Sequence, residues 1–318
     1  MRRLNLWTGA AIVAALIAAA ILSPVLPLPG PYEQRLEARL APPGGESWLG
    51  RDSKGRDLLS RVVFGTRISL TVGLVTVGIS AAAGLLIGAL SGYMGGLVDE
   101  SLMRLTDVFL AFPGILLAFA LMAILGPGVQ NVILALCVMG WVGYARLVRV
   151  QVLALKAEDY VTAARSLGGG APRIIVRHLL PNLLGPVLVE ATFGVASAIL
   201  AEAGLSFLGL GTQPPTPSWG ALMKEGHLRL FEAPHLSFFP GLALMAPSWG
   251  STSSATACGT CWTQGCGPRV NPEAAEPLNK FAIDRFQLVS VGRKQVHQRL
   301  DARKGSVWSL DVSRLAGK

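Results

Sequence analysis

The chain up to Met245 alternates long apolar stretches with short polar connections. An apolar run of about 18 or more residues is long enough to cross a bilayer as a helix. Runs of this kind lie near Leu6–Pro29, Ile68–Gly92, Val108–Leu125, Val129–Val148 and Leu183–Leu205. A truncated candidate begins at Phe238 and stops near Met245. The pattern predicts an all-α integral membrane protein.

Composition supports a membrane protein and argues against nucleic-acid binding. Of the 318 residues, 51% are hydrophobic and 15% are charged, and the mean hydropathy is +0.49. Soluble domains usually carry about 25% charged residues. The net charge of +9 comes from basic residues that flank the apolar runs. A nucleic-acid surface would instead show a continuous basic stripe with interleaved aromatic residues.

Positive charge sets the expected orientation, because loops rich in Lys and Arg stay on the cytoplasmic side. Arg2 and Arg3 precede the first apolar run, and the basic loop 146–182 follows the fourth. The N-terminus and this loop are therefore expected in the cytoplasm. Residues 1–30 form either a cleaved signal peptide or an N-terminal transmembrane anchor. The length of the run and the lack of a convincing small-residue cleavage site favour the anchor.

Residues 31–67 are expected to form an external loop, although they include many basic residues. Acidic residues in the same loop largely offset this charge, and a long loop follows charge bias less strictly. Near its end, the polar residues Ser60 and Arg61 alternate with apolar ones from Leu58 to Phe64. This alternation predicts an interfacial amphipathic helix that turns into the membrane at Gly65. The alternative is a solvated charged loop.

The basic segment 158–182, EDYVTAARSLGGGAPRIIVRHLLPN, lies between two apolar runs and predicts two short amphipathic helices. The first is expected over Asp159–Leu167, and the triple glycine that begins at Gly168 should end it with a tight turn. The second is expected to restart at Pro172 and to stop before Pro181. A basic helix pair on the cytoplasmic side predicts a docking element for a protein outside the bilayer.

The segment Ala198–Gly220, AILAEAGLSFLGLGTQPPTPSWG, is expected at the outer end of the fifth span. Its three prolines, Pro214, Pro215 and Pro217, prevent helix continuation and predict a rigid extended loop that can meet a partner outside. Glu202 lies within the span, and an ionisable group there is a candidate functional residue. It is expected either to face a transport pathway or to pair with a partner subunit.

No catalytic arrangement is apparent in the sequence. There is no Walker-type phosphate loop, the histidines match no metal spacing, and no serine has a nucleophile-elbow context. An intramembrane enzyme would need paired polar groups within the spans, and the pattern shows none. We therefore expect a non-catalytic chain that binds no cofactor; if ATP drives it, the ATPase is a separate chain.

The ordered motifs resemble the permease subunits of ABC importers in the dipeptide/oligopeptide/nickel branch. The pair Ala163–Ala164, Gly168 and the terminal Leu180–Pro181 match the family's cytoplasmic coupling loop. Thr162 replaces the usual Glu and His178 the usual Ile, and both departures are familiar from this branch. The segments Leu49–Gly73 and Ala198–Gly220 resemble the corresponding segments of the same branch. The resemblance covers roughly Leu6–Met245.

The resemblance implies a type I ABC importer permease with about six transmembrane helices, whose core is residues 68–246. It implies a multi-pass protein of the inner membrane that carries peptides or a small solute such as nickel. Its partners would be a homologous second permease subunit, two ATPase subunits that bind ATP and Mg²⁺, an extracytoplasmic solute-binding protein and the lipid bilayer. The expected ATPase-coupling residues are Ala163, Ala164, Gly168, Arg173, Leu180 and Pro181. The expected external gate or binding-protein contacts are Gln213, Pro214, Pro215, Pro217 and Trp219.

Residues 247–318 depart from this pattern. After Met245 the chain becomes polar and supplies no sixth span. If the third base of each codon is read with the first two of the next, one permitted reading from Ser248 to Gly267 is LGFNLLGDGLRDVLDPRLR. That reading resembles the usual ending of dipeptide-type permeases. We therefore predict that residues 247–318 are an out-of-frame, disordered tail and that the sixth span is lost.

The cysteines of the tail suggest a different function. Cys258, Cys261 and Cys266 superficially match a zinc knuckle or a redox pair. A tetrahedral zinc site needs four ligands, and His297 is distant in the sequence. The alternative to a permease is a membrane-anchored receptor or regulatory protein with a metal-binding C-terminal tail, which would require the tail to fold.

Overall fold

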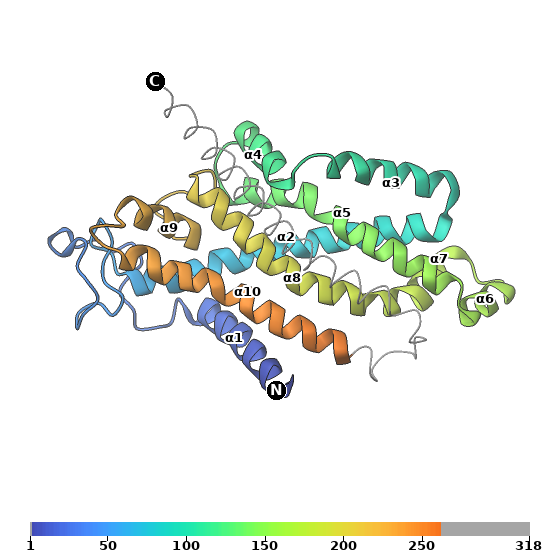
Figure 1. Ribbon diagram of the computed structural model, residues 1–318, viewed down its shortest axis with the longest axis horizontal. Coiled ribbons are helices and arrows are strands. Elements are labelled where there is room, and N and C mark those ends of the chain that lie inside the picture. Colours follow the sequence, from blue (N-terminus) through green and yellow to red (C-terminus); the bar gives the residue numbers. More distant parts are fainter. Residues whose placement is uncertain (1, 262–318) are drawn as a thin grey trace, which may run out of the picture. The chain divides into compact units, whose positions relative to one another are not determined.

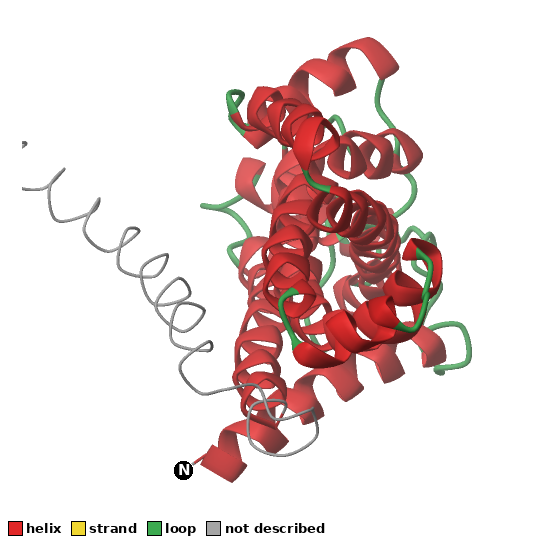
Figure 2. Ribbon diagram, turned by 90° about the vertical axis from the view of Figure 1, so that its right-hand side faces the viewer, coloured by secondary structure: helices red, strands yellow, loops and turns green. Residues whose placement is uncertain are grey.

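The computed structural model describes residues 2–261, and the side chains of residues 7–250. This part of the chain is helical and contains no β-strand (Figures 1 and 2). The helices are α1 Arg2–Leu22, α2 Leu58–Met94, α3 Gly96–Leu110, α4 Gly114–Leu125, α5 Val129–Lys156, α6 Asp159–Ser166, α7 Ala171–Ile174, α8 Leu180–Phe207, α9 Trp219–Leu228 and α10 His235–Cys261. A 3₁₀ turn covers Leu36–Ala38, and a π-turn, Ile175–Leu179, joins α7 to α8.

Three helices of the described part are long and apolar enough to span a membrane: α2, α5 and the continuous stretch Ala171–Phe207. The pair α3–α4 forms a fourth candidate, bent by 81°. The apolar part of α1 is shorter, Trp7–Leu22. The predicted all-helical membrane architecture is confirmed, although a sharp bend before Gly114 divides the third predicted span.

The centre of the bundle is the contact between α2 and α5. Gly84, Gly88 and Gly92 share one face of α2 because they are spaced four residues apart. A Cβ at Gly88 would lie 2.8 Å from Cβ of Val148, and one at Gly92 would lie 2.9 Å from Cβ of Val152. The glycines therefore let the two backbones approach closely, as small residues do between membrane helices.

The start of α2 differs from the predicted interfacial helix. Asp57 caps α2 by accepting a hydrogen bond from the backbone N–H of Ser60 at 2.8 Å, and the helix then continues through Gly65 to Met94. A Cβ at Gly65 would lie 3.2 Å from Cδ1 of Trp219. The prediction of a turn at Gly65 was wrong, because this glycine provides room for a neighbouring helix and not for a bend.

The ion pairs of α3 also differ from expectation. Arg104 and Asp107 are three residues apart, a spacing at which helix side chains can pair. In the structure Arg104 instead pairs with Glu100 at 3.3 Å, and Asp107 pairs with Arg146 of α5. The start of α3 is also held to α5 by an ion pair. Both carboxylate oxygens of Asp99 accept hydrogen bonds from the Arg149 guanidinium, at 2.5 and 2.6 Å.

Helix α10 extends into the segment that was expected to begin the disordered tail at residue 247. It begins at His235, continues past Met245 and Pro247, and ends at Cys261, so residues 247–261 are helical and not disordered. Residues 262–318, including Cys266 and His297, lie outside the described residues.

Candidate functional site

Helices α6 and α7, here called the coupling pair, lie at one end of the bundle, and α9 lies at the other (Figure 1). Helix α6 forms where the sequence predicted it, over Asp159–Ser166. Gly168 then has φ +80°, in the left-handed region that glycine adopts without strain. The N–H of Gly169 donates to the carbonyl oxygen of Ala164 at 3.0 Å, and a Cβ at Gly169 would lie 2.7 Å from that oxygen. The turn therefore requires both glycines.

The second helix of the coupling pair does not stop before Pro181 as predicted. Helix α7 passes through the π-turn into α8, and Pro181 lies in the first turn of α8. Proline cannot donate to the carbonyl one turn earlier and its ring crowds that carbonyl. A π-turn widens the backbone at this point, so the helix absorbs the proline instead of ending. The coupling pair is thus continuous with a membrane-spanning helix.

Three buried side chains attach the coupling pair to the bundle, and the sequence reasoning missed them. Val161 of α6, Ile174 of α7 and Leu179 of the π-turn are each fully buried. They join one hydrophobic cluster with Val148 and Val152 of α5. The sequence signal was weak because Val161 is isolated among polar and small residues, and because the spacing from Ile174 to Leu179 suits a π-turn and not an α-helix.

The six residues expected to couple to the ATPase fall into two groups, partly buried and exposed. Partly buried are Ala164 and Leu180. Exposed at the surface of the coupling pair and its junction with α8 are Ala163, Gly168, Arg173 and Pro181. A partner protein could therefore contact the second group directly, while Ala164 packs against the hydrophobic cluster.

Tyr160 links α6 to the start of α8. The Nδ2 group of Asn182 donates to the Tyr160 hydroxyl at 3.2 Å, and the Tyr160 ring lies 6.4 Å from the ring of His178. Partial burial raises the pKa of Tyr160 above its ordinary value. These contacts hold α6 against the π-turn and the start of α8.

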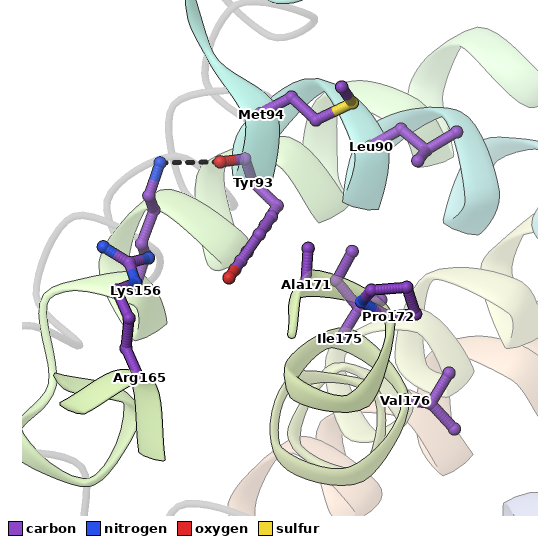
Figure 3. Close-up of a pocket in the computed structure, with 9 residues that line it drawn as sticks. All are labelled: Leu90, Tyr93, Met94, Lys156, Arg165, Ala171, Pro172, Ile175 and Val176. Carbon is purple, nitrogen blue, oxygen red and sulfur yellow. Dashed lines mark hydrogen bonds between the residues drawn. The ribbon is translucent and has the colours of Figure 1, made fainter. Parts of the chain in front are cut away.

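An open pocket of about 710 Å³ lies between the coupling pair and the adjacent ends of α2 and α5 (Figure 3). Its lining residues are Leu90, Tyr93, Met94, Lys156, Arg165, Ala171, Pro172, Ile175 and Val176. The ammonium of Lys156 donates to the backbone carbonyl of Tyr93 at 2.7 Å and so caps the C-terminal turn of α2. We call this cavity the inner pocket.

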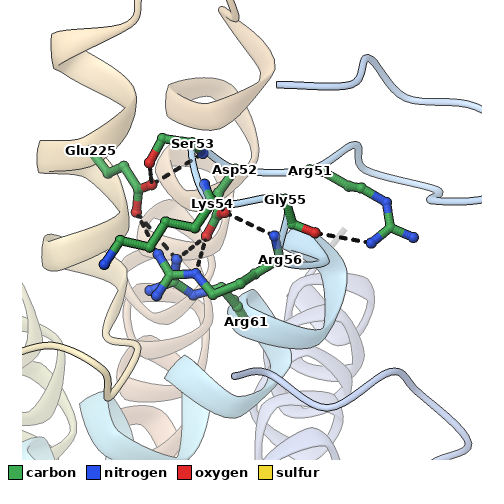
Figure 4. Close-up of polar contacts among 8 residues, drawn as sticks. All are labelled: Arg51, Asp52, Ser53, Lys54, Gly55, Arg56, Arg61 and Glu225. Carbon is green, nitrogen blue, oxygen red and sulfur yellow. Dashed lines mark hydrogen bonds and ion pairs between the residues drawn. The ribbon is translucent and has the colours of Figure 1, made fainter. Parts of the chain in front are cut away.

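At the opposite end, a buried ion cluster fastens the outer loop to α9 (Figure 4). Asp52 pairs with Arg56 at 2.6 Å and with Arg61, and all three are almost fully buried. Glu225 of α9 pairs with Arg56 at 3.3 Å and with Arg61 at 3.2 Å, and it accepts a hydrogen bond from the Ser53 hydroxyl. Two of the loop's basic residues, Arg56 and Arg61, are therefore neutralised within the chain.

The ion cluster leads to a testable prediction. Asp52→Asn leaves two buried guanidinium groups with Glu225 as their remaining carboxylate, so we expect the free energy of unfolding to fall by about 3 kcal/mol. Denaturation of the purified protein in detergent measures this. The matched control is Glu33→Gln in the same loop, whose pair with Arg35 is exposed and whose loss should cost no more than about 1 kcal/mol. Equal effects of the two substitutions would contradict a structural role for the cluster.

The proline loop contains exposed and buried residues. Gln213, Pro214 and Pro215 are exposed, whereas Pro217 and Trp219 are buried. The indole N–H of Trp219 donates to the backbone carbonyl of Val62 at 3.1 Å. Pro217 and Trp219 therefore support the loop from beneath in this conformation, and their expected role as external gate or binding-protein contact stays a prediction.

Glu202 does not line an open pathway in this structure, in contrast to one expectation. It is 1% exposed, and its carboxylate accepts hydrogen bonds from Ser206 at 2.6 Å, Ser69 at 3.2 Å and Thr212 at 3.4 Å. These hydroxyls come from α8, α2 and the proline loop respectively. Glu202 therefore holds three segments together within this chain instead of facing a second subunit.

Comparison with known proteins agrees with this arrangement. The family described as "Binding-protein-dependent transport system inner membrane component" matches residues 84–254. The chain is 40% identical over 237 residues to the dipeptide transport system permease protein DppC of Alkalihalophilus pseudofirmus, covering 74% of this chain and 78% of the relative. It is 44% identical over 202 residues to the glutathione transport system permease protein GsiD of Pectobacterium atrosepticum, covering 64% and 67%.

A solved structure shows the same fold. One chain of the MetNI methionine ABC transporter, in an inward facing conformation, superimposes with a TM-score of 0.52 at 18% identity, covering 63% of this chain and 97% of that one. Identity this low supports the fold alone. Together with the family match and the 40% identical relative, it confirms that the chain belongs to the inner membrane components of binding-protein-dependent transport systems and is a multi-pass permease subunit of an ABC importer.

Proposed function

We propose that this permease subunit imports peptides. The observation that carries the proposal is its likeness to DppC and GsiD, which are named for dipeptide and glutathione transport. Both named substrates are short peptides, and neither name refers to nickel. A receptor or regulatory role is not favoured, because the family match, residues 84–254, includes the coupling pair and the helices from the end of α2 onward. Uptake of labelled dipeptides and of nickel, with and without the gene, distinguishes the two cargo classes.

We propose the following assembly for the importer. The chain pairs with a homologous second permease subunit, and two ATPase subunits attach on the cytoplasmic side and bind ATP and Mg²⁺. An extracytoplasmic solute-binding protein delivers the cargo at the other face. The N-terminus and the coupling pair lie in the cytoplasm, in line with the positive charge of Arg2, Arg3, Arg146 and Arg149. The chain itself performs no catalysis and binds no cofactor.

The proposed mechanism uses the coupling pair as a rigid lever. Closure of the ATPases pushes on exposed residues such as Ala163 and Arg173. Buried Val161, Ile174 and Leu179 transmit the movement to α5, and the continuous π-turn transmits it to α8. Packed helices respond by moving as bodies, which switches a central pathway between outward and inward access.

The first test of this assembly is retention of the ATPase. Arg173 is exposed on the coupling pair, so Arg173→Glu should weaken ATPase binding about tenfold or more, because reversing a charge within an interface disrupts its electrostatic complementarity. The tagged chain is purified from its native membranes in mild detergent, and the retained ATPase is measured by its ATP hydrolysis.

The matched control is Arg229→Glu, which makes the same charge reversal near α9 at the opposite end of the bundle. It should retain the ATPase. Loss of the ATPase in both variants, or in neither, would contradict contact through the coupling pair.

The exposed part of the proline loop is proposed to contact the solute-binding protein or to shape the external gate. Gln213 is exposed and donates from Nε2 to the carbonyl oxygens of Gly209 and Gly211, at 3.0 and 3.1 Å, so the loop is ordered before docking. A photocrosslinking residue at Gln213 should capture the solute-binding protein or the second permease subunit. Capture of the ATPase instead would overturn both the contact and the orientation.

A further inference from the structure

We propose that the inner pocket binds the headgroup and part of an acyl chain of an anionic phospholipid from the cytoplasmic leaflet. The cytoplasmic position of the pocket rests on the orientation given in the proposed function. The pocket opens where α2 and α5 end, at Met94 and Lys156, which is the depth at which a spanning helix meets the headgroups. Basic pockets between membrane helices on this side are suited to acidic headgroups.

Two cations gather at the inner pocket without an acidic partner. The ammonium of Lys156 lies 5.5 Å from the centre of the Tyr93 ring, and the guanidinium of Arg165 lies 5.7 Å from it. Figure 3 shows both on the side of Tyr93 away from Pro172. Neither residue takes part in an ion pair with any of the described side chains. Two like charges beside the same ring repel each other, and a bound phosphate would relieve the repulsion.

The rest of the pocket is aliphatic and open to its surroundings. Leu90 is 46% exposed, Met94 60% and Val176 63%. These side chains lie on the other side of Tyr93 from the two cations (Figure 3). A phospholipid places a charged phosphate and an acyl chain side by side, so it matches both halves of the pocket. An inorganic anion would gain nothing from the apolar half.

A lipid seated in the inner pocket would touch α2, α5 and both helices of the coupling pair. Arg165 belongs to α6, whereas Ala171 belongs to α7 and Ile175 to the π-turn. The lipid would therefore support the coupling pair at the place where the transmitted movement enters the bundle. The bound lipid would then be a structural part of the coupling region, in addition to the surrounding bilayer.

The test measures lipid retention on the full chain. The chain is purified in detergent and incubated with dioleoyl phosphatidylglycerol or dioleoyl phosphatidylcholine, and bound lipid is counted by native mass spectrometry. We expect selective retention of phosphatidylglycerol, reduced about tenfold or more in the double variant Lys156→Gln/Arg165→Gln. The matched control is Arg173→Gln/Arg177→Gln, which removes the same charge from exposed neighbours that do not line the pocket. It should retain the lipid.

Two further variants test the charged half and the apolar half of the pocket separately. Because Lys156 also caps α2, the single variant Arg165→Gln serves if the double variant fails to fold. Val176→Trp, at an exposed position, should block the acyl half and reduce retention without changing charge. Equal binding of the two lipids, equal loss in the control variant, or displacement of the lipid by inorganic phosphate alone would overturn the proposal. Lipid retention is measured without ATPase or transport, so its failure is separate from failure of the proposed function.

Discussion

Gly168→Val is expected to abolish peptide uptake while leaving the chain inserted in the membrane. Gly168 has φ +80°, a conformation that costs an ordinary residue about 1–2 kcal/mol and a β-branched residue more. No atom lies within 4 Å of the Cβ position, so the strain is in the backbone alone. Gly169 cannot take over the turn, because it already lies against the carbonyl of Ala164. Relaxation of the strained backbone in the variant would therefore reorient α6 against α7.

The control for this substitution is Gly170→Val. Gly170 has φ −69° and ψ 156°, which any residue adopts, and a Cβ there would meet only Cδ of Pro172 at 4.0 Å. Uptake of labelled dipeptide, ATP hydrolysis and membrane yield are measured for both variants. Near-normal uptake by Gly168→Val, with the ATPase still bound, would remove Gly168 from the coupling role. Equal loss of uptake in both variants would show that the glycine run acts through flexibility and not through one backbone angle.

Restoring the reading frame after Met245 is expected to raise the amount of assembled permease severalfold. Helix α10 runs to Cys261, but its sequence after Met245 is rich in serine and threonine, and α10 is not among the described helices apolar enough to span a membrane. The shifted reading, LGFNLLGDGLRDVLDPRLR, continues the apolar run from Phe238 and then becomes charged, as a span does where it leaves the bilayer. Leucine and phenylalanine each favour insertion by a few tenths of a kcal/mol.

The genetic code allows this proposal to be checked before any protein is made. In the shifted frame, Trp249 followed by Gly250 must encode Gly, and Cys261 followed by Trp262 must encode Leu. Resequencing the gene shows whether the codons between these points permit the proposed reading. Membrane yield and copurified ATPase then compare the restored chain with the present one. Codons that exclude the shifted reading, or equal assembly of the two chains, would refute the frameshift.

The sequence by itself predicted much of the helical architecture. Long apolar runs form spanning helices because the bilayer core offers no hydrogen-bond partners for backbone N–H and C=O groups, which must therefore bond within the helix. The bounds of α6 followed from local chemistry, since a glycine with positive φ ends a helix wherever it occurs. The resemblance in the coupling loop and in Ala198–Gly220 led to the family, which the comparisons confirmed. Each of these features depends on neighbours along the chain.

Only the tertiary structure decided the features that depend on distant residues. Trp219 is buried because Val62 supplies a carbonyl and Gly65 supplies space, and neither is near it in the sequence. Arg56 and Arg61 belong to a buried cluster because Glu225 reaches them from α9. The continuity of the helix through Pro181 likewise accompanies burial of Leu179 against the bundle. Periodicity and motifs report local propensity, whereas burial and charge pairing are set by which helices meet.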